Sequence, residues 1–331
     1  MEVCSLAEWM GMLSEKKVYI KDIKPGDRVT DTFLVVEKNM ASSQKGNPYL
    51  AVKLRDNTGD IDGRVWDNAV ELSGRFRKGD IVSIQSRATS YRNVIQLSIS
   101  DIECIDKSRY NPADYSPSSK LNIEEMFKDL MIFVETVETP PLKALLDLIF
   151  KDDEFVSLFK NVPAAKGFHH FYIGGLLEHT LSVTRLLEKT AEHYRTTNRD
   201  LIIAGGILHD IGKIKELSLS NVIDYTDEGR LIGHISLGFE LINEKIALIE
   251  DFPEQLSMEL RHIMLSHHGV LEYGSPKRPK TLEALIVNFI DDLDAKVNAF
   301  QTCIESSTDN ESDWTSFHRL LERFIYKGKN E

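Results

Sequence analysis

The most informative part of this sequence is the stretch LHDIGK at residues 208–213. It places a histidine, an aspartate and a lysine at the end of an apolar run, and that run predicts a helix over residues 199–210. Imidazole nitrogen and carboxylate oxygen suit divalent transition metals. The stretch therefore predicts a metal site at the end of a helix.

Candidate ligands for this site recur in the surrounding sequence, within or at the ends of predicted helices with apolar neighbours. They are His179, His209, Asp210, His234, His267, His268 and Asp291. Any one of these histidines taken alone is more readily explained as a core residue bonded to a backbone group, but their number weakens that explanation. The three cysteines are far apart and form no CxxC pair, which argues against a structural zinc site.

Two more residues in this half are candidates for contact with a substrate. Lys213 follows Asp210 by three residues and lies near the same helical face, where its ammonium can hold a phosphate. The alternative is a solvated lysine at a helix end. His170 belongs to a histidine pair that precedes two glycines, and we assign it either to a loop or to a substrate contact. We predict Asp210 and Lys213 as the catalytic residues.

The first half of the chain alternates between apolar and polar residues in the manner of strands. The predicted strands cover residues 29–36, 49–54, 61–66, 81–88 and 94–105, with a short helix over 68–76. Strands in this order, with a helix between the third and the fourth, are typical of the OB fold, a small barrel that often binds oligonucleotides. We therefore expect a nucleic-acid-binding domain.

Aromatic and basic residues are spread over these strands, as stacking on bases and pairing with phosphates require. The candidates for nucleic-acid binding are Tyr49, Arg64, Arg87, Tyr91 and Arg92. Phe33 and Trp66 are assigned to the barrel core. A slip of one residue in the alternation would exchange the two faces of the sheet.

The expected organisation is multidomain, an N-terminal all-β OB barrel followed by an all-α domain. We place an N-terminal extension at 1–17, the OB domain at 18–106, a linker at 107–120 and the catalytic domain at 121–331. The linker is rich in serine and proline and has no periodicity. In the catalytic domain, helices are predicted from Asn122 to about Val137, from Pro140 onward, and over 233–249, 254–267, 280–306 and 312–326, with a small hairpin at 219–232.

Charge and hydropathy restrict the class of protein. The formal net charge is -12, and residues 1–109 carry 17 basic and 16 acidic residues, whereas the remainder carries 23 and 36. This balance argues against indiscriminate binding of nucleic acid by the whole surface. No signal peptide and no apolar run long enough to span a membrane are visible, so we expect a cytoplasmic protein without a membrane partner.

The histidine and aspartate pattern resembles the HD phosphohydrolase superfamily. His179, the HDIGK form at 209–213 and the stretch IDDLDA at 290–295 match its ligand motifs. The resemblance implies that Asp291, rather than Asp292 or Asp294, is a ligand and that Asp210 contacts two ions. It also implies that His234, His267 and His268 are the additional ligands of binuclear members.

Nearly the whole chain, from about Val18 to about Lys327, is similar to the YhaM family of 3′→5′ exoribonucleases, in the order of its domains and in the run HHFYIGGLLEHT at 169–180. The resemblance implies Mn²⁺- or Co²⁺-dependent removal of nucleotides from single-stranded RNA, and sometimes DNA, with two ions per chain.

Two other functions stay open at this point. One is hydrolysis of a small nucleotide or a cyclic dinucleotide, which other HD proteins perform. The other is a non-catalytic RNA-binding protein with a vestigial site, although every expected ligand position is filled. The sequence leaves the oligomeric state open, including a homo-oligomer.

Overall fold

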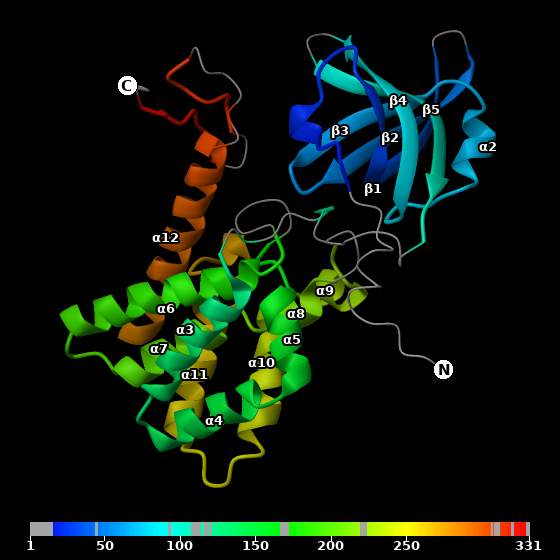
Figure 1. Ribbon diagram of the computed structural model, residues 1–331. Coiled ribbons are helices and arrows are strands. Elements are labelled where there is room, and N and C mark those ends of the chain that lie inside the picture. The colour runs from blue at the N-terminus through cyan, green and yellow to red at the C-terminus, as the bar shows by residue number, and fades with distance from the viewer. Residues whose placement is uncertain are drawn as a thin grey trace, which may run out of the picture. The chain divides into compact units, whose positions relative to one another are not determined.

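The computed structural model describes residues 16–43, 46–91, 94–106, 114–115, 119, 121–165, 172–218, 224–305, 307, 312–318 and 321–328. The chain divides near residue 118 into two compact units, a barrel and a bundle of helices. Each unit has its own hydrophobic core. Figure 1 shows the labelled strands and the short helix α2 in the first unit and the other labelled helices in the second.

The first unit is a closed barrel with the strand order β1-β2-β3-β5-β4. Its elements are η1 Ile20–Asp22, β1 Arg28–Ser42, β2 Pro48–Asp56, β3 Gly59–Val65, α2 Ala69–Ser73, β4 Ile81–Tyr91 and β5 Val94–Cys104. Neighbouring strands are antiparallel except β3 and β5, which pair in parallel. The predicted OB barrel is confirmed, including the helix between the third and fourth strands.

Strand β1 is longer than the predicted strand at 29–36. Its first half pairs with β4 and its second half with β2, and the register shifts between Val35 and Glu37. A bulge bends a strand and increases its twist, so one long strand can close a small barrel. Leu50, Val52 and Leu54 of β2 point into the core, which leaves the alternate residues of that strand on the outer face.

The second unit consists mainly of α-helices of very different lengths. They are α3 Ile123–Glu135, α4 Pro140–Phe150, α5 Asp153–Asn161, α6 Gly175–His193, α7 Arg199–Leu208, α8 Lys213–Glu216, α9 Asp227–Leu231, α10 His234–Ile246, α11 Glu254–Ser266 and α12 Leu282–Glu305. The helices predicted at Asn122, Pro140, 199–210, 233–249, 254–267 and 280–306 are confirmed to within a few residues. In the described part of the chain, no helix is long and apolar enough to span a bilayer.

Helix α7 is the centre of this unit, because its residues from Leu201 to Leu208 are all buried. Two glycines allow the neighbouring helices to approach it closely. A Cβ on Gly206 would lie 2.2 Å from Leu187 Cδ1 of α6, and one on Gly205 would lie 2.9 Å from Ile263 Cδ1 of α11. Packing against α6 and α11 therefore holds α7 in place along the residues that precede the HDIGK stretch.

Two predictions for this unit are wrong in the structure. The helix expected over 312–326 is absent from residues 312–318 and 321–328, where Trp314 pairs with Tyr326 through an antiparallel bridge. Cross-strand ring contact, with centroids 5.1 Å apart, and packing of Leu321 and Ile325 on the end of α12 favour this arrangement over a helix.

The second wrong prediction for this unit is the hairpin expected over 219–232. Residues 219–223 lie outside the described residues, and Asp227–Leu231 is a helical turn, α9, capped by the Thr226 hydroxyl. A single bridge between Leu217 and Tyr225 is the part of the expected hairpin that forms. The competing signal was the N-cap, since threonine followed by acidic residues favours a helix start.

The cap of α3 gives a test of the fold. Asn122 Oδ1 accepts hydrogen bonds from the backbone N–H groups of Glu124 at 2.9 Å and Glu125 at 3.2 Å. Asn122→Ala should lower the free energy of unfolding of the helical unit by about 1 kcal/mol, whereas Asn122→Ser should preserve it. Chemical denaturation followed by circular dichroism measures both, and equal losses in the two variants would contradict the capping role.

Candidate metal centre

Imidazole rings from four helices and their ends converge in the helical unit, and each ring has its Nδ1 nitrogen engaged. His209 Nδ1 donates to Gly206 O and His267 Nδ1 to Met264 O, both at 2.7 Å. These histidines occupy the C-cap positions of α7 and α11, so they satisfy carbonyl groups that a helix end leaves without partners. His268 Nδ1 donates to Tyr273 O at 2.8 Å. In each case the Nε2 nitrogen is left facing the centre.

Two of the rings are held by carboxylates instead. His179 Nδ1 lies 2.7 Å from Asp294 Oδ2, and His234 Nδ1 lies 2.9 Å from Glu216 Oε1. Ser182 donates a short hydrogen bond to the other oxygen of Asp294. A carboxylate behind a histidine fixes its tautomer and makes the opposite nitrogen a stronger ligand. All of the rings therefore present Nε2 to the same region.

A first cluster forms around the Nε2 nitrogen of His179. It lies 3.1 Å from Asp291 Oδ1, 3.3 Å from His209 Nε2 and 3.6 Å from Asp210 Oδ2. Ligands at right angles around an ion at about 2.1 Å lie roughly 3 Å apart, so these separations are close to those of a metal site. The three residues His179, His209 and Asp210 offer ligand atoms within 4.8 Å of one another.

A second cluster shares Asp210 through its other oxygen. Asp210 Oδ1 lies 3.5 Å from His234 Nε2 and 3.6 Å from His267 Nε2, and His268 completes the group. These Oδ1 and Nε2 atoms of Asp210, His234 and His267 are buried and have no hydrogen-bond partner. Buried polar atoms are rarely left unsatisfied. Their convergence fits a divalent cation, which takes such oxygen and nitrogen ligands.

Close backbone contacts bring the second cluster together. A Cβ on Gly212 would lie 2.0 Å from the carbonyl oxygen of His234, so the glycine of HDIGK allows the start of α10 to approach. Gly233, just before His234, has φ +79°, in the left-handed region that glycine adopts readily. Asn288 of α12 donates to His267 O at 2.6 Å and ties the end of α11 to α12.

Burial and charge shift the pKa values in opposite directions in the two clusters. Burial alone would lower the pKa of His209, but Asp210 and Asp291 outweigh it and raise that pKa to about 10. Burial lowers the pKa of His267 and of His268 in the second cluster. An ion at the first cluster must therefore displace a proton from His209, whereas the lowered pKa values of His267 and His268 favour the neutral imidazole that binds a metal.

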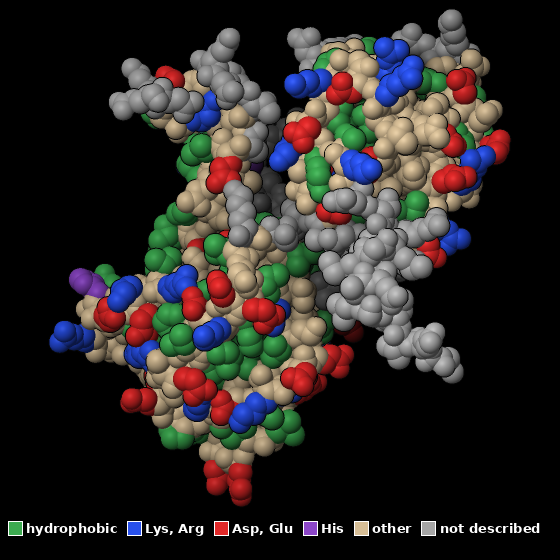
Figure 2. Space-filling view, in the orientation of Figure 1, with side chains coloured by type: hydrophobic (Ala, Val, Ile, Leu, Met, Phe, Trp, Pro, Cys, Tyr) green, Lys and Arg blue, Asp and Glu red, His purple; other side chains and the backbone are tan. Residues whose placement is uncertain are grey.

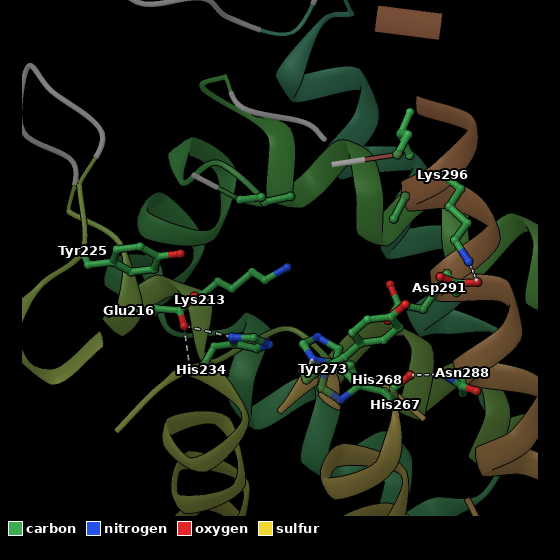
Figure 3. Close-up of a pocket in the computed structure, with 15 residues that line it drawn as sticks. Lys213, Glu216, Tyr225, His234, His267, His268, Tyr273, Asn288, Asp291 and Lys296 are labelled. Atoms are coloured by element: carbon green, nitrogen blue, oxygen red, sulfur yellow. Dashed lines mark hydrogen bonds and ion pairs between the residues drawn. The ribbon is translucent and has the colours of Figure 1, made fainter. Parts of the chain in front are cut away.

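Lys213 is the positive group closest to the shared carboxylate. Its Nζ lies 2.5 Å from Asp210 Oδ2, and the lysine is 6% exposed. Burial would raise the pKa of Asp210, but the Lys213 ammonium and His209 lower it well below the ordinary value. Lys213 also lines a pocket of about 520 Å³ together with Glu216, His234, His267, His268 and Asp291. Figure 3 shows these side chains pointing into the pocket.

Comparisons with known proteins identify the two domains and the family of the chain. Residues 176–296 match the model of the HD domain, and residues 34–105 match that of an OB-fold nucleic acid binding domain. The chain is 32% identical over 303 residues to a 3′-5′ exoribonuclease YhaM of Bacillus subtilis, covering 91% of this chain and 95% of that one. The chain belongs to the YhaM family of 3′-5′ exoribonucleases. The YhaM proteins of a Geobacillus species and of Halalkalibacterium halodurans are also 32% identical, covering 91% and 85% of this chain and 92% and 87% of theirs.

All the predicted metal ligands of this YhaM family member lie in the two clusters, and Asp291 rather than Asp292 contacts the histidines. Sequence reasoning missed Glu216 and Asp294 as partners of the ligands. Asp294 follows Asp291 by three residues and so shares its helical face, a signal that could have found it. Nothing in the sequence around Glu216 pairs it with His234, which is 18 residues away along the chain.

The predicted nucleic-acid-binding residues that the structure describes lie on the barrel. Arg87 of β4, Ser98 of β5 and Arg64 of β3 are successive partners across the sheet. Adjacent strands are about 4.8 Å apart, which places the two arginines roughly 10 Å from each other. Tyr91 is 59% exposed at the end of β4. Arg92 and His170 lie outside the described residues.

The assignment of Trp66 to the barrel core is wrong, and that of Phe33 is confirmed. Phe33 is fully buried, whereas Trp66 is 50% exposed and its ring lies 4.8 Å from that of Tyr49. Trp66 follows the last residue of β3, where the alternation continues outward. Figure 2 shows acidic and basic side chains interspersed over the visible face of the helical unit, so broad positive potential there does not explain binding of a polyanion.

The two carboxylates behind the ligands give a test of the clusters. Glu216→Gln should lower the affinity for the ion at the second cluster, and Asp294→Asn should lower that for the ion at the first. Each loss should be about 10- to 100-fold. Asp292→Asn serves as the control, because Asp292 pairs with Lys296 at 2.6 Å. Calorimetric titration with Mn²⁺ measures the affinities, and unchanged binding in both test variants would contradict the roles of Glu216 and Asp294.

Proposed function

We propose that this chain is a metal-dependent hydrolase that removes nucleotides from the 3′ end of single-stranded RNA, with single-stranded DNA as a further substrate. The observation that carries the proposal is the convergence of Nε2 nitrogens on the two oxygens of Asp210. The names of the YhaM relatives support the direction and the substrate.

The proposed ions are Mn²⁺ or Co²⁺, two per chain. The first would be held by His179, His209, Asp210 and Asp291, and the second by Asp210, His234, His267 and His268. The donor set fits because it contains nitrogen and oxygen ligands and no thiolate. Bound ions would supply Lewis-acid charge to the phosphoryl group and acidify a water molecule for attack.

The residues of the chain itself position and polarise the substrate. Lys213 carries a buried ammonium into the pocket, where it can bind a phosphodiester oxygen. The depressed pKa of Asp210 keeps its carboxylate ionised at neutral pH, so both oxygens stay available as acceptors. Asp294 and Glu216 keep His179 and His234 in one tautomer, which holds the geometry without rearrangement during the reaction.

The barrel would hold the RNA strand. Exposed Trp66 and half-buried Tyr49 offer adjacent rings for bases, and Arg64 of β3 and Arg87 of β4 offer charges for phosphates. Stacking is worth about 1–3 kcal/mol per base and does not depend on sequence. A strand-holding surface favours a polymer over a mononucleotide as the substrate of the helical unit.

Removal of the shared carboxylate tests the reaction. Asp210→Ala should abolish hydrolysis of end-labelled single-stranded RNA in Mn²⁺ while leaving RNA binding intact, because both clusters lose their common ligand. Chelation with EDTA should stop the wild-type reaction, and added Mn²⁺ should restore it. Products resolved by length should shorten from the 3′ end, and a near wild-type rate in Asp210→Ala would refute the site.

Loss of the exposed ring tests the role of the barrel. Trp66→Ala should raise the KM for an RNA of ~30 nucleotides by about tenfold. This length exceeds the roughly 4–16 nucleotides that one OB fold covers. The kcat on a dinucleotide should stay unchanged, since so short a substrate needs no strand-holding surface. Val70→Ala, which alters an exposed side chain on α2, is the matched control. Equal effects of Trp66→Ala on both substrate lengths would argue against strand holding.

A further inference from the structure

The pocket beside the metal ligands has aromatic walls that the proposed chemistry does not use. Tyr225 and Tyr273 both line it, and they are 39% and 66% exposed. Its volume of about 520 Å³ is in the range of sites for small ligands. Rings so exposed contribute little to the hydrophobic core, which leaves their placement at the pocket to be explained.

Tyr273 contacts the candidate metal ligand His268 through its backbone. It ends the 3-10 turn η4 Leu271–Tyr273, and Gly274 follows with φ +82°. Its own carbonyl oxygen accepts the hydrogen bond from His268 Nδ1 at 2.8 Å. The backbone of Tyr273 thus orients His268, and this contact places the residue at the wall of the pocket beside the second cluster.

Backbone contacts of a different segment hold Tyr225 near the same cluster. Its backbone forms the bridge with Leu217, and the next residue, Thr226, donates its N–H to Glu216 O at 2.9 Å. Glu216 in turn binds His234. In Figure 3, Tyr225 lies on one side of Lys213 and Tyr273 on the other.

We propose that Tyr225 and Tyr273 form a nucleoside subsite, in which the base of the terminal nucleotide stacks on tyrosine while its phosphate lies at Lys213 and the metal ligands. Aromatic faces, an ammonium and metal ligands in one pocket match a phosphate ester that carries an aromatic base. Stacking without hydrogen bonds to base edges accepts every base, as stepwise removal of successive nucleotides requires. The inference rests on the proposed function and specifies what part of the substrate the pocket recognises.

The subsite is tested by comparing adenosine 5′-monophosphate with ribose 5-phosphate, which lacks the base. Calorimetry with the full chain loaded with Mn²⁺ should give about tenfold tighter binding of the nucleotide. Tyr273→Ala and Tyr225→Ala should each reduce this preference, and Tyr273→Phe should keep it, because phenylalanine retains the aromatic face. Tyr194→Ala, which alters an exposed tyrosine near the end of α6, should have no effect.

The control for the barrel is Trp66→Ala, in which the preference for the nucleotide should persist. Metal analysis of each variant should show unchanged manganese, since the carbonyl of Tyr273 remains. Equal binding of the two probes by a wild-type chain that degrades RNA would overturn the subsite alone, as would a preference that survives in Tyr273→Ala and Tyr225→Ala. Failure of the wild-type chain to degrade RNA, with the preference intact, would overturn the proposed function and leave the subsite in place.

Discussion

The rest of the helical unit depends on keeping one buried carboxylate ionised. Asp210 is 2% exposed, and a charge so far from water is costly unless other groups compensate it. Lys213 of α8 and the imidazole of His209 provide that compensation, and further imidazoles from α6, α10 and α11 face the same carboxylate. The helices can approach one carboxylate closely because glycine occupies the tight contacts, above all at Gly212.

The geometry of helix ends explains much of the precision of the site. A helix leaves its last carbonyl groups without partners, and a histidine at the C-cap can bind one of them with Nδ1. His209 and His267 do this in the same way, each with the carbonyl three residues earlier. A structural requirement of the helix thus also directs each Nε2 toward Asp210. No further polar side chain is needed to orient these two rings, and the packing around α7 holds the His209 ring in place.

The sequence predicted the fold class and the candidate ligands that lie together in the two clusters, because both depend on local patterns. Alternation located the strands, and the histidines and aspartates that meet in space stand in recognisable motifs. What it missed depends on contacts over long sequence distances. The partnership of Glu216 with His234 needs the turn around Gly212, and the exposure of Trp66 depends on where β3 ends. The helix expected over 312–326 gave way because ring contacts between distant residues outweighed helical propensity.

Charge balance connects the buried groups with the proposed pair of ions. The ligands Asp210 and Asp291 and the outer carboxylates Asp294 and Glu216 are four acidic groups, against the single ammonium of Lys213. Imidazoles that ligate a metal are neutral, so they do not change this total. One divalent ion would leave the centre with a net negative charge and repel a phosphodiester. Two ions would leave a single positive charge, which the phosphodiester offsets when it binds, and this balance favours a binuclear site for a polyanionic substrate.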